Sequence, residues 1–466
     1  AVAGVATFND LSLNKKGGSY TLTASATGLT SGTSSAFNVA PGAPSALTIV
    51  SGNGQSAAAG SVLNTISVRL RDALNNGIDG ASIAFAVTGG GGTIANATAI
   101  TDANGVATVT WTIGSGPQTM TATFSGLPSI TITATSTTAI LVWTGATNSD
   151  WSLVSNWSPA FVPSAVDAIT IPVTSTAPII SAPVSIFSLV VATGATLTNN
   201  STLTVTGSVD AGTTITGSGS LVLAGTSGTL KGVINQALTV GAGTHTLNGA
   251  TTVTGTVTMN ATGTLSVGGQ TLLVTGSLGT SGTGRLAMTN AADIVTVTGN
   301  ATFAGGSENT FLTAGTLNLE RDFTASGTAF AASGAHVIRF TGNHEGTQTI
   351  TFSPSAGLGL NHTVFDGIDN KVLVGAPVFL GDVSILATSW PVSGSVTAKI
   401  GGNFSDATNV MYDTNGGWRV DNTIFSGTNK TINSGFITSN VTVSGTVSLT
   451  PCGKACTALL ATAWQA

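Results

Sequence analysis

The sequence contains very little charge. Only 7% of its 466 residues are Asp, Glu, Lys or Arg, against roughly 25% in an average soluble protein. The 13 Lys and Arg residues form no basic run, and the formal net charge is −5. Because nucleic-acid binding depends on clustered basic side chains, this class of function is excluded.

Cysteines and long apolar runs are also scarce. Cys452 and Cys456 both lie in the tail 451–466, so packing rather than disulfides must stabilise the rest of the chain. We expect these two cysteines to form a disulfide in an oxidising compartment. No apolar run approaches the ~18 residues of a membrane-spanning helix. The first residues, AVAG, carry neither an initiator Met nor a signal-peptide pattern, which is typical of a mature or trimmed piece.

What the sequence does contain is β-forming residues. The hydrophobic fraction is 41%, with 61 glycines, and Val, Ile, Leu and Thr alternate through most of the length. This composition is sufficient to build a core, so we do not expect disorder. A chain of this length exceeds one compact β-domain, which predicts several domains or a repeat array. The predicted fold class is all-β.

Residues up to about 140 repeat with a long period. The segment 4–8 (GVATF) returns as 105–109 (GVATV), an offset close to the ~100 residues of an immunoglobulin-like sandwich. Each copy is followed by an alternating strand and a Gly-Leu turn. We therefore predict a complete sandwich at 42–138, preceded by only the C-terminal half of another at 1–41.

Two motifs in the complete domain are specific. The sequences RDALNNGIDGASIAF at 71–85 and DANGVATVTW at 102–111 resemble the bacterial Ig-like repeats of the invasin and intimin type. The resemblance implies a secreted, extracellular protein of the bacterial cell surface. It also implies that these domains are rigid spacers rather than enzymes.

The next segment, 139–175, is rich in tryptophan. Its pattern, W-x-G at Trp143, then Trp151, Asn-Trp157 and a later I-P, resembles the first segment of bacterial β-helix surface proteins. The first coil of a solenoid exposes its core, so we predict that the rings form a cap. The alternative is that Trp151 and Trp157 form a platform on which a sugar stacks.

From 176 to 450 short strands recur. The units LTVTG at 203–207, LVTG at 273–276 and TVTG at 296–299 return about every twenty residues, as in solenoid rungs. We predict a right-handed parallel β-helix with Val and Leu inside and Thr outside. It resembles filamentous-haemagglutinin and pectin-lyase-like solenoids in its recurring short strands, without a motif that is diagnostic of either family. The part richer in Phe and charge, 320–450, is a continuation or a separate β-domain.

Ionisable residues gather in one stretch of this region. Polysaccharide-cleaving solenoids use acid and base groups on neighbouring rungs, so an enzyme is one alternative, with His344, Glu345, His362, Asp366 and Asp369 as its site. However, the spacing fits neither a repeated-Asp calcium site nor paired zinc ligands. We therefore expect solvated loops, with no catalysis, metal or cofactor. The stretch contains Glu320, Arg321, Asp322, His336, Arg339, His344, Glu345, His362, Asp366, Asp369 and Lys371.

These features predict a structural or adhesive surface protein in which Ig-like spacers present a solenoid. Two partners fit: a surface glycan, or further copies of the same chain. The incomplete domain 1–41 is either cut from a longer array or accepts a strand from a neighbouring copy. Because such a head-to-tail contact does not close, it would propagate into a filament.

Overall fold

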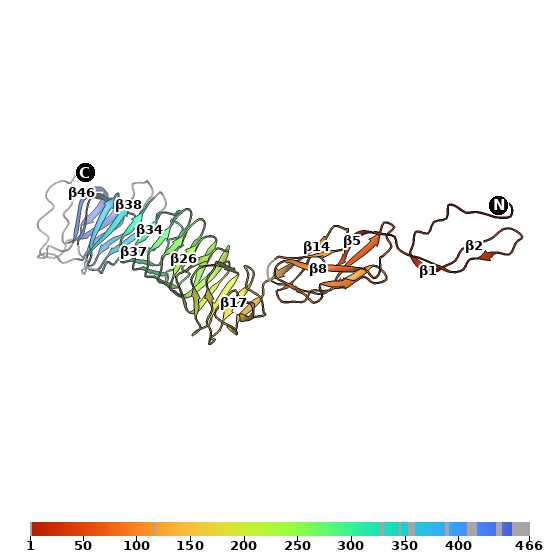
Figure 1. Cartoon of the computed structure of the whole chain (residues 1–466). Helices are drawn as coiled ribbons and strands as arrows, with labels where there is room; N and C mark the ends of the chain where they lie inside the picture. The colour runs from red at the N-terminus through yellow and green to blue at the C-terminus, as the bar shows by residue number, and fades with distance from the viewer. Residues whose placement is uncertain are drawn as a thin grey trace. The chain divides into compact units, whose positions relative to one another are not determined.

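The computed structural model describes residues 2–114, 117–326, 330–343, 346–352, 359–386, 391–407, 417–434 and 440–449. It is almost entirely β-structure, with a short 3-10 helix at Val154–Asn156. In these residues no helix has the length and apolarity that a membrane crossing requires. The chain divides into two units (Figure 1): Ala1–Ala139 with Pro159–Val162, and Ile140–Ser158 with Pro163–Ala466.

The strands of the first unit are short near the N-terminus and longer afterwards. They are β1 Gly17–Tyr20, β2 Thr23–Ala24, β3 Gly32–Thr33, β4 Phe37–Val39, β5 Pro44–Ser51, β6 Gln55–Ala58, β7 Ile66–Asp72, β8 Ser82–Gly89, β9 Thr93–Ile94, β10 Thr98–Ile100, β11 Val106–Val109, β12 Trp111–Thr112, β13 Pro117–Thr123 and β14 Ile130–Thr137.

Strands β5 to β14 form the predicted Ig-like sandwich. A five-stranded sheet in the order β10-β8-β13-β14-β6 accompanies a three-stranded sheet in the order β11-β7-β5. Alternate residues of β7 are buried, as expected when one face of a strand meets a core. The core is mainly aliphatic with two aromatic rings, and it includes Leu47, Ile66, Val68, Leu70, Ile83, Phe85, Val109, Trp111, Met120 and Ile132.

Residues 2–41 form two small antiparallel ladders instead of a sandwich. Strand β1 pairs with β4, and β2 pairs with β3. No residue between 2 and 41 is buried. This segment therefore contains short strands without a hydrophobic core, and the repeated run 4–8 is not one of the strands.

The second unit is one continuous β-structure. Its strands are β15 Ile140–Trp143, β16 Trp157–Ser158, β17 Ala168–Ile171, β18 Ile179–Ile180, β19 Val184–Ile186, β20 Ser188–Val191, β21 Leu197–Asn199, β22 Thr202–Val205, β23 Val209–Thr216, β24 Ser220–Leu223, β25 Ser227–Ile234, β26 Ala237–Val240, β27 Thr244–Val253, β28 Val257–Met259, β29 Thr264–Ser266, β30 Thr271–Val274, β31 Leu278–Thr280, β32 Arg285–Ala287, β33 Ile294–Val297, β34 Ala301–Phe303, β35 Thr316–Leu319, β36 Phe323–Ala325, β37 Val337–Phe340, β38 Thr347–Phe352, β39 His362–Phe365, β40 Asn370–Gly375, β41 Val378–Phe379, β42 Val383–Ile385, β43 Val392–Ile400, β44 Phe404–Asp406, β45 Trp418–Ser434 and β46 Asn440–Leu449.

These strands stack as the rungs of a parallel β-solenoid (Figure 1). One interior column shows the register, since Leu203, Leu221, Leu238, Val257 and Leu278 pair in succession and are all buried. The neighbouring outward column contains Thr239, Thr258, Thr302 and Thr324. In these two columns aliphatic residues lie inside and threonines outside, as predicted, whereas on other solenoid strands Thr251, Thr264 and Thr280 are buried.

The parallel sheet begins earlier than the expected boundary at 176. Strand β15 pairs antiparallel with β16 but parallel with β17, and β17 pairs in parallel with β20. The tryptophan segment therefore contributes the first rungs. At the other end, β36 to β46 remain in the same sheet, so the part from 320 onward continues the solenoid and is not a separate domain.

The interior changes character along the solenoid. From β34 onward, aromatic rings replace much of the aliphatic filling, with ring centroids 4.8–6.4 Å apart along the stack. Rungs with more residues enclose more space, and large rings fill it at the density of a protein core. The stack contains Phe303, Phe323, Phe330, Phe340, Phe352, Phe365, Phe379, Phe404 and Trp418.

Candidate functional site

Polar side chains form an outward column on successive rungs of the solenoid. Strands β33, β35 and β37 pair in parallel, with Thr296 opposite Asn318 and Asn318 opposite Arg339. The Asn318 Nδ2 donates to Thr296 Oγ1 at 3.3 Å. Neighbouring strands lie ~4.8 Å apart, so this column offers a hydroxyl, an amide and a guanidinium at regular steps.

A second column lies two residues after the first on the rungs of β35, β37 and β39. It consists of Glu320, Thr341 and Asp366, whose backbone N–H groups each donate to the rung before at 2.8–3.0 Å. A shallow hollow of about 450 Å³ lies over the two columns. Its lining residues are Thr296, Asn318, Glu320, Arg339, Thr341, Asn343, Asp366, Gly367 and Ile368.

An ion pair fixes the charged groups of this hollow. The Arg339 Nε donates to Asp366 Oδ2 at 3.1 Å, and its Nη2 donates to the same oxygen. The other carboxylate oxygen of Asp366 accepts the backbone N–H of Gly367 at 2.8 Å. The Arg339 side chain is 39% exposed and that of Asp366 is 19% exposed. Both groups are thus oriented by the protein and still reach solvent.

The loop that contains Asp366 is held from beneath by a buried lysine. The Lys371 Nζ donates to the carbonyls of Gly367 (3.0 Å) and Asp369 (2.9 Å). Burial lowers the pKa of Lys371 to about 8, an effect that the carboxylates of Asp369 and Asp366 partly oppose. Gly367 has a φ of +76°, and a Cβ there would lie 2.4 Å from the Thr341 carbonyl oxygen. Only glycine fits at this position.

The residues of the alternative enzyme site have different environments. Asp366 faces the hollow, whereas Asp369 is buried and its Oδ1 accepts the Gly346 N–H at 3.3 Å. On β39, the His362 Nδ1 accepts the backbone N–H of Asp382 at 3.2 Å. His344 and Glu345 lie outside the described residues. Within the part of the chain that the structure describes, no three His, Cys, Asp or Glu side chains are placed to hold a metal ion.

Sequence reasoning named the charged members of this hollow but not the uncharged ones. Thr296, Asn318 and Asn343 were missed because their pairing depends on the rung register. The steps between rungs are uneven, so the sequence spacing alone does not align them. Once the register is known, the succession of polar residues at one outward position is the signal.

Trp151 and Trp157, the proposed sugar platform, are interior residues. Each is 3% exposed, and their ring centroids lie 4.7 Å apart with the planes at 77°. Trp143 packs on Trp157 in the same edge-to-face manner. Because neither ring offers a face to solvent, a sugar cannot stack on them in this arrangement. The geometry is that of a cap.

Several polar groups of the cap are hydrogen-bonded, although the buried Trp151 Nε1 has no partner among the described residues. The Trp157 Nε1 donates to the Trp151 carbonyl at 2.8 Å. The buried Asn156 side chain accepts the N–H groups of Thr147 and Asn148 and donates to the Asp150 carbonyl. Such bonding removes the cost of burying polar groups. Cys452 and Cys456, the predicted disulfide, lie outside the described residues.

A second hollow lies in the N-terminal ladders and is apolar. Phe8, Leu11 and Leu22 are 61%, 64% and 45% exposed. Exposed apolar side chains that cluster in this way mark surfaces suited to a partner. The hollow is lined by Phe8, Leu11, Leu22, Thr23, Ala24, Gly32, Thr33 and Ser34.

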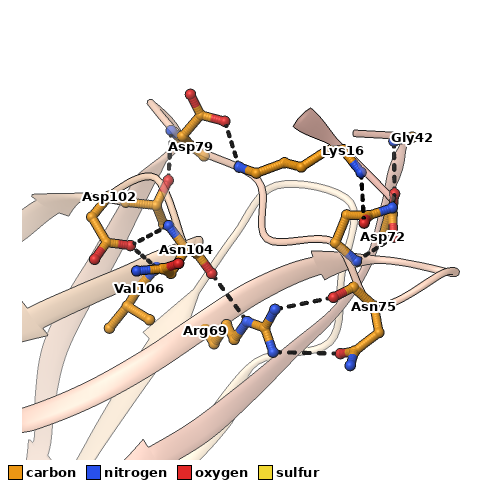
Figure 2. Close-up of polar contacts among 12 residues, drawn as sticks. Lys16, Gly42, Arg69, Asp72, Asn75, Asp79, Asp102, Asn104 and Val106 are labelled. Carbon is orange, nitrogen blue, oxygen red and sulfur yellow. Dashed lines mark hydrogen bonds and ion pairs between the residues drawn. The ribbon is translucent and has the colours of Figure 1, made fainter. Parts of the chain in front are cut away.

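Polar contacts attach the N-terminal segment to the sandwich (Figure 2). The Lys16 Nζ lies 3.0 Å from the Asp79 Oδ1. The Asn76 side chain accepts the Lys16 backbone N–H and donates to the Asn14 carbonyl, both at 3.0 Å. The segment is therefore held at the turn between β7 and β8.

Family comparisons match two adjoining segments. Residues 46–140 match the bacterial Ig-like domain (group 1). This part of the chain is a bacterial Ig-like domain. The predicted resemblance to repeats of the invasin and intimin type is thereby confirmed. Residues 142–238 match a domain of unknown function (DUF8693), which includes the tryptophan cap and the first rungs. None of the curated proteins matches the chain.

Several solved structures are similar to part of the chain. The D0–D1 domain of intimin is 20% identical over 24% of this chain and 58% of its own, with a TM-score of 0.16. The Escherichia coli adhesin FdeC is 21% identical over 26% and 41%, with a TM-score of 0.18. Domains 4 and 5 of the S-layer protein SbsC are 17% identical over 25% and 65%, with a TM-score of 0.17. The matches span less than two thirds of each of these structures.

Proposed function

We propose that this chain is a bacterial surface protein with a structural or adhesive role, in which the Ig-like domain is a spacer that presents the solenoid. The observation that carries the proposal is the direct succession of a bacterial Ig-like domain and one uninterrupted parallel sheet. Each rung packs on its neighbours only, so such a body grows in length while keeping a continuous core. The proposed role includes no catalysis.

Labelling of intact cells tests the surface location. Thr302 is exposed on β34, and Leu317 on β35 is buried. In a background with Cys452 and Cys456 changed to Ser, the variant Thr302→Cys should react with a membrane-impermeant maleimide on intact bacteria. Leu317→Cys is the matched control, since it should react only after denaturation. Reaction of Thr302→Cys only after cell lysis would contradict the proposal.

We also propose that the N-terminal ladders accept a strand from another copy of the chain. The support is physical: residues 2–41 have no core, and an apolar hollow is exposed beside two-stranded ladders whose outer edges are unpaired. Strand addition satisfies the backbone groups of such an edge and covers the apolar side chains. If the added strand comes from the far end of another copy, the contact propagates into a filament.

Sedimentation at increasing protein concentration tests this assembly. We expect the wild-type chain to form long assemblies. Leu22→Asp should lower the amount of these assemblies, because it places a charge in the apolar hollow. Val62→Asp is the matched control, since Val62 is 64% exposed and precedes β7, at the opposite end of that strand from the turn where the N-terminal segment is attached. A wild-type chain that stays monomeric at the highest concentration rules out the filament and leaves the surface role to the labelling experiment.

A further inference from the structure

The hollow on β33 to β39 combines donors and acceptors in a chain that is otherwise poor in charge. Asn318 and Arg339 supply N–H groups, and Glu320 and Asp366 supply carboxylate oxygens. The hollow therefore contains one positively charged guanidinium and two negatively charged carboxylates. A ligand that suits this surface therefore has many hydroxyl or amide groups and no negative charge.

The ladder pattern excludes one type of ligand from this flank. Each of β33, β35, β37 and β39 is hydrogen-bonded in parallel to the rungs on both sides. No backbone edge is open here, so a peptide cannot add as a further strand. Recognition has to proceed through the outward side chains, which repeat at the rung spacing of ~4.8 Å.

We propose that this hollow is a binding site for an uncharged glycan, built from hexose or N-acetylhexosamine units. Asn318 and Glu320 engage sugar hydroxyls from adjacent positions on one rung. Arg339, already oriented by Asp366, donates to a ring or hydroxyl oxygen from the next rung. The inference goes beyond the proposed surface role, and each of the two can fail without the other.

The rigidity of the site supports this assignment. Lys371 fixes the carbonyls of Gly367 and Asp369, so the loop that presents Asp366 is ordered before any ligand arrives. A pre-ordered site loses less conformational entropy on binding. None of the residues that line the hollow is aromatic, so binding by a single site should be weak, with a dissociation constant on the order of 1 mM.

Saturation-transfer NMR and titration calorimetry with defined oligosaccharides test the proposal. The probes are cellohexaose, maltohexaose and hexameric N-acetylglucosamine, with an oligogalacturonate of the same length as the acidic comparison. We expect at least one uncharged probe to bind, and the oligogalacturonate to bind about tenfold more weakly, because the two carboxylates repel it.

Two variants locate the binding site. Asn318→Ala and Glu320→Ala should each weaken binding by about tenfold, the usual loss when a hydrogen bond to a ligand is removed. Thr324→Ala is the matched control, because Thr324 lies outward on β36 in a different column of the same region. Unchanged thermal unfolding of each variant shows that the fold is retained. Any one of three results overturns the assignment: equal binding by the wild type and both variants, preference for the acidic probe, or no binding by any probe.

Discussion

A short run occurs twice in this chain, as VATF at 5–8 and VATV at 106–109, in opposite environments. In the sandwich, residues 106–109 form β11 and pair with β7, so that Ala107 and Val109 are 1% and 6% exposed. Their counterparts in the N-terminal segment, Ala6 and Phe8, are exposed, Phe8 by 61%. The difference lies in strand pairing, because β11 pairs with β7, whereas none of the described residues pairs along 6–8.

This contrast shows that the burial of an apolar side chain depends on the strands around it and not on the local sequence motif alone. An alternating strand supplies an apolar face, but the face stabilises the fold only when a second sheet covers it. In the N-terminal segment the run 5–8 forms no strand, and among the described residues no second sheet covers the β1–β4 and β2–β3 ladders that follow it. The apolar residues Phe8, Leu11 and Leu22 are therefore exposed.

The largest effect should come from trimming the same residue type in the two copies. Leu70 on β7 is fully buried, whereas Leu22 in the ladders is 45% exposed. Leu70→Ala should lower the free energy of unfolding of the sandwich by about 2–5 kcal/mol. Leu22→Ala should change it by less than about 0.5 kcal/mol.

Hydrogen exchange followed by mass spectrometry measures both variants locally. Peptides that contain β7 and β11 should exchange much faster in Leu70→Ala and at the wild-type rate in Leu22→Ala. A loss of several kcal/mol in Leu22→Ala, measured on monomers, would break the comparison, because it would show that the N-terminal segment already belongs to a core.

Two buried carboxyl groups extend the comparison to the solenoid. In the sandwich, Asp72 accepts hydrogen bonds from the Asn76 side chain and the backbone N–H groups of Gly42, Leu74 and Asn76. The Asn76 side chain leads the bonds that lower its pKa to about 2. In the solenoid, Glu308 is 1% exposed, and burial raises its pKa to about 8, against the opposing charge of Arg285. The hydrogen-bond donors around each carboxyl group thus decide the direction in which its pKa shifts.

The second prediction uses this raised pKa. The folded Glu308 has a pKa of about 8 against 4.5 for the ordinary group, so its contribution is fully present below pH 4.5. It is lost as the pH rises towards 8, because the unfolded chain releases the proton first. The stability of the wild-type solenoid should fall by roughly 2–4 kcal/mol across this window.

Glu308→Gln should remove most of that pH dependence, since the amide carries no ionisable proton. Urea unfolding at pH 5, 6, 7 and 8 measures it, and the variant should exceed the wild type in stability at pH 8. Thr302→Ala is the control, because Thr302 is exposed and has no ionisable group, and it should keep the wild-type slope. If Glu308→Gln has the same slope as the wild type, the buried neutral carboxyl is the wrong explanation.

The sequence predicted the two architectures because their signals are local and periodic. Alternation in 66–72 and the recurring short strands after 176 each follow from one face packing against a core. The hollow could not be predicted in full, because the pairing of Thr296 with Asn318 and Arg339 depends on how many residues each turn uses. Burial of Trp151 and Trp157 was likewise open from sequence, since a cap and a sugar platform require the same residue type.

The smallest effect should come from the contacts that attach the ladders to the sandwich. Lys16 pairs with Asp79 at 3.0 Å, and the Lys16 ammonium, through its hydrogen bond, is the main cause that lowers the pKa of Asp79. Lys16→Ala should speed hydrogen exchange around residues 14–16 severalfold and leave β7 unchanged, because exposed ion pairs stabilise weakly. The neighbouring Lys15 has an exposed side chain, so Lys15→Ala is the control. The difference between wild type and Lys16→Ala should shrink in about 1 M salt, which screens exposed charges. If it persists there, the hydrogen bonds of Asn76 rather than the ion pair hold the segment.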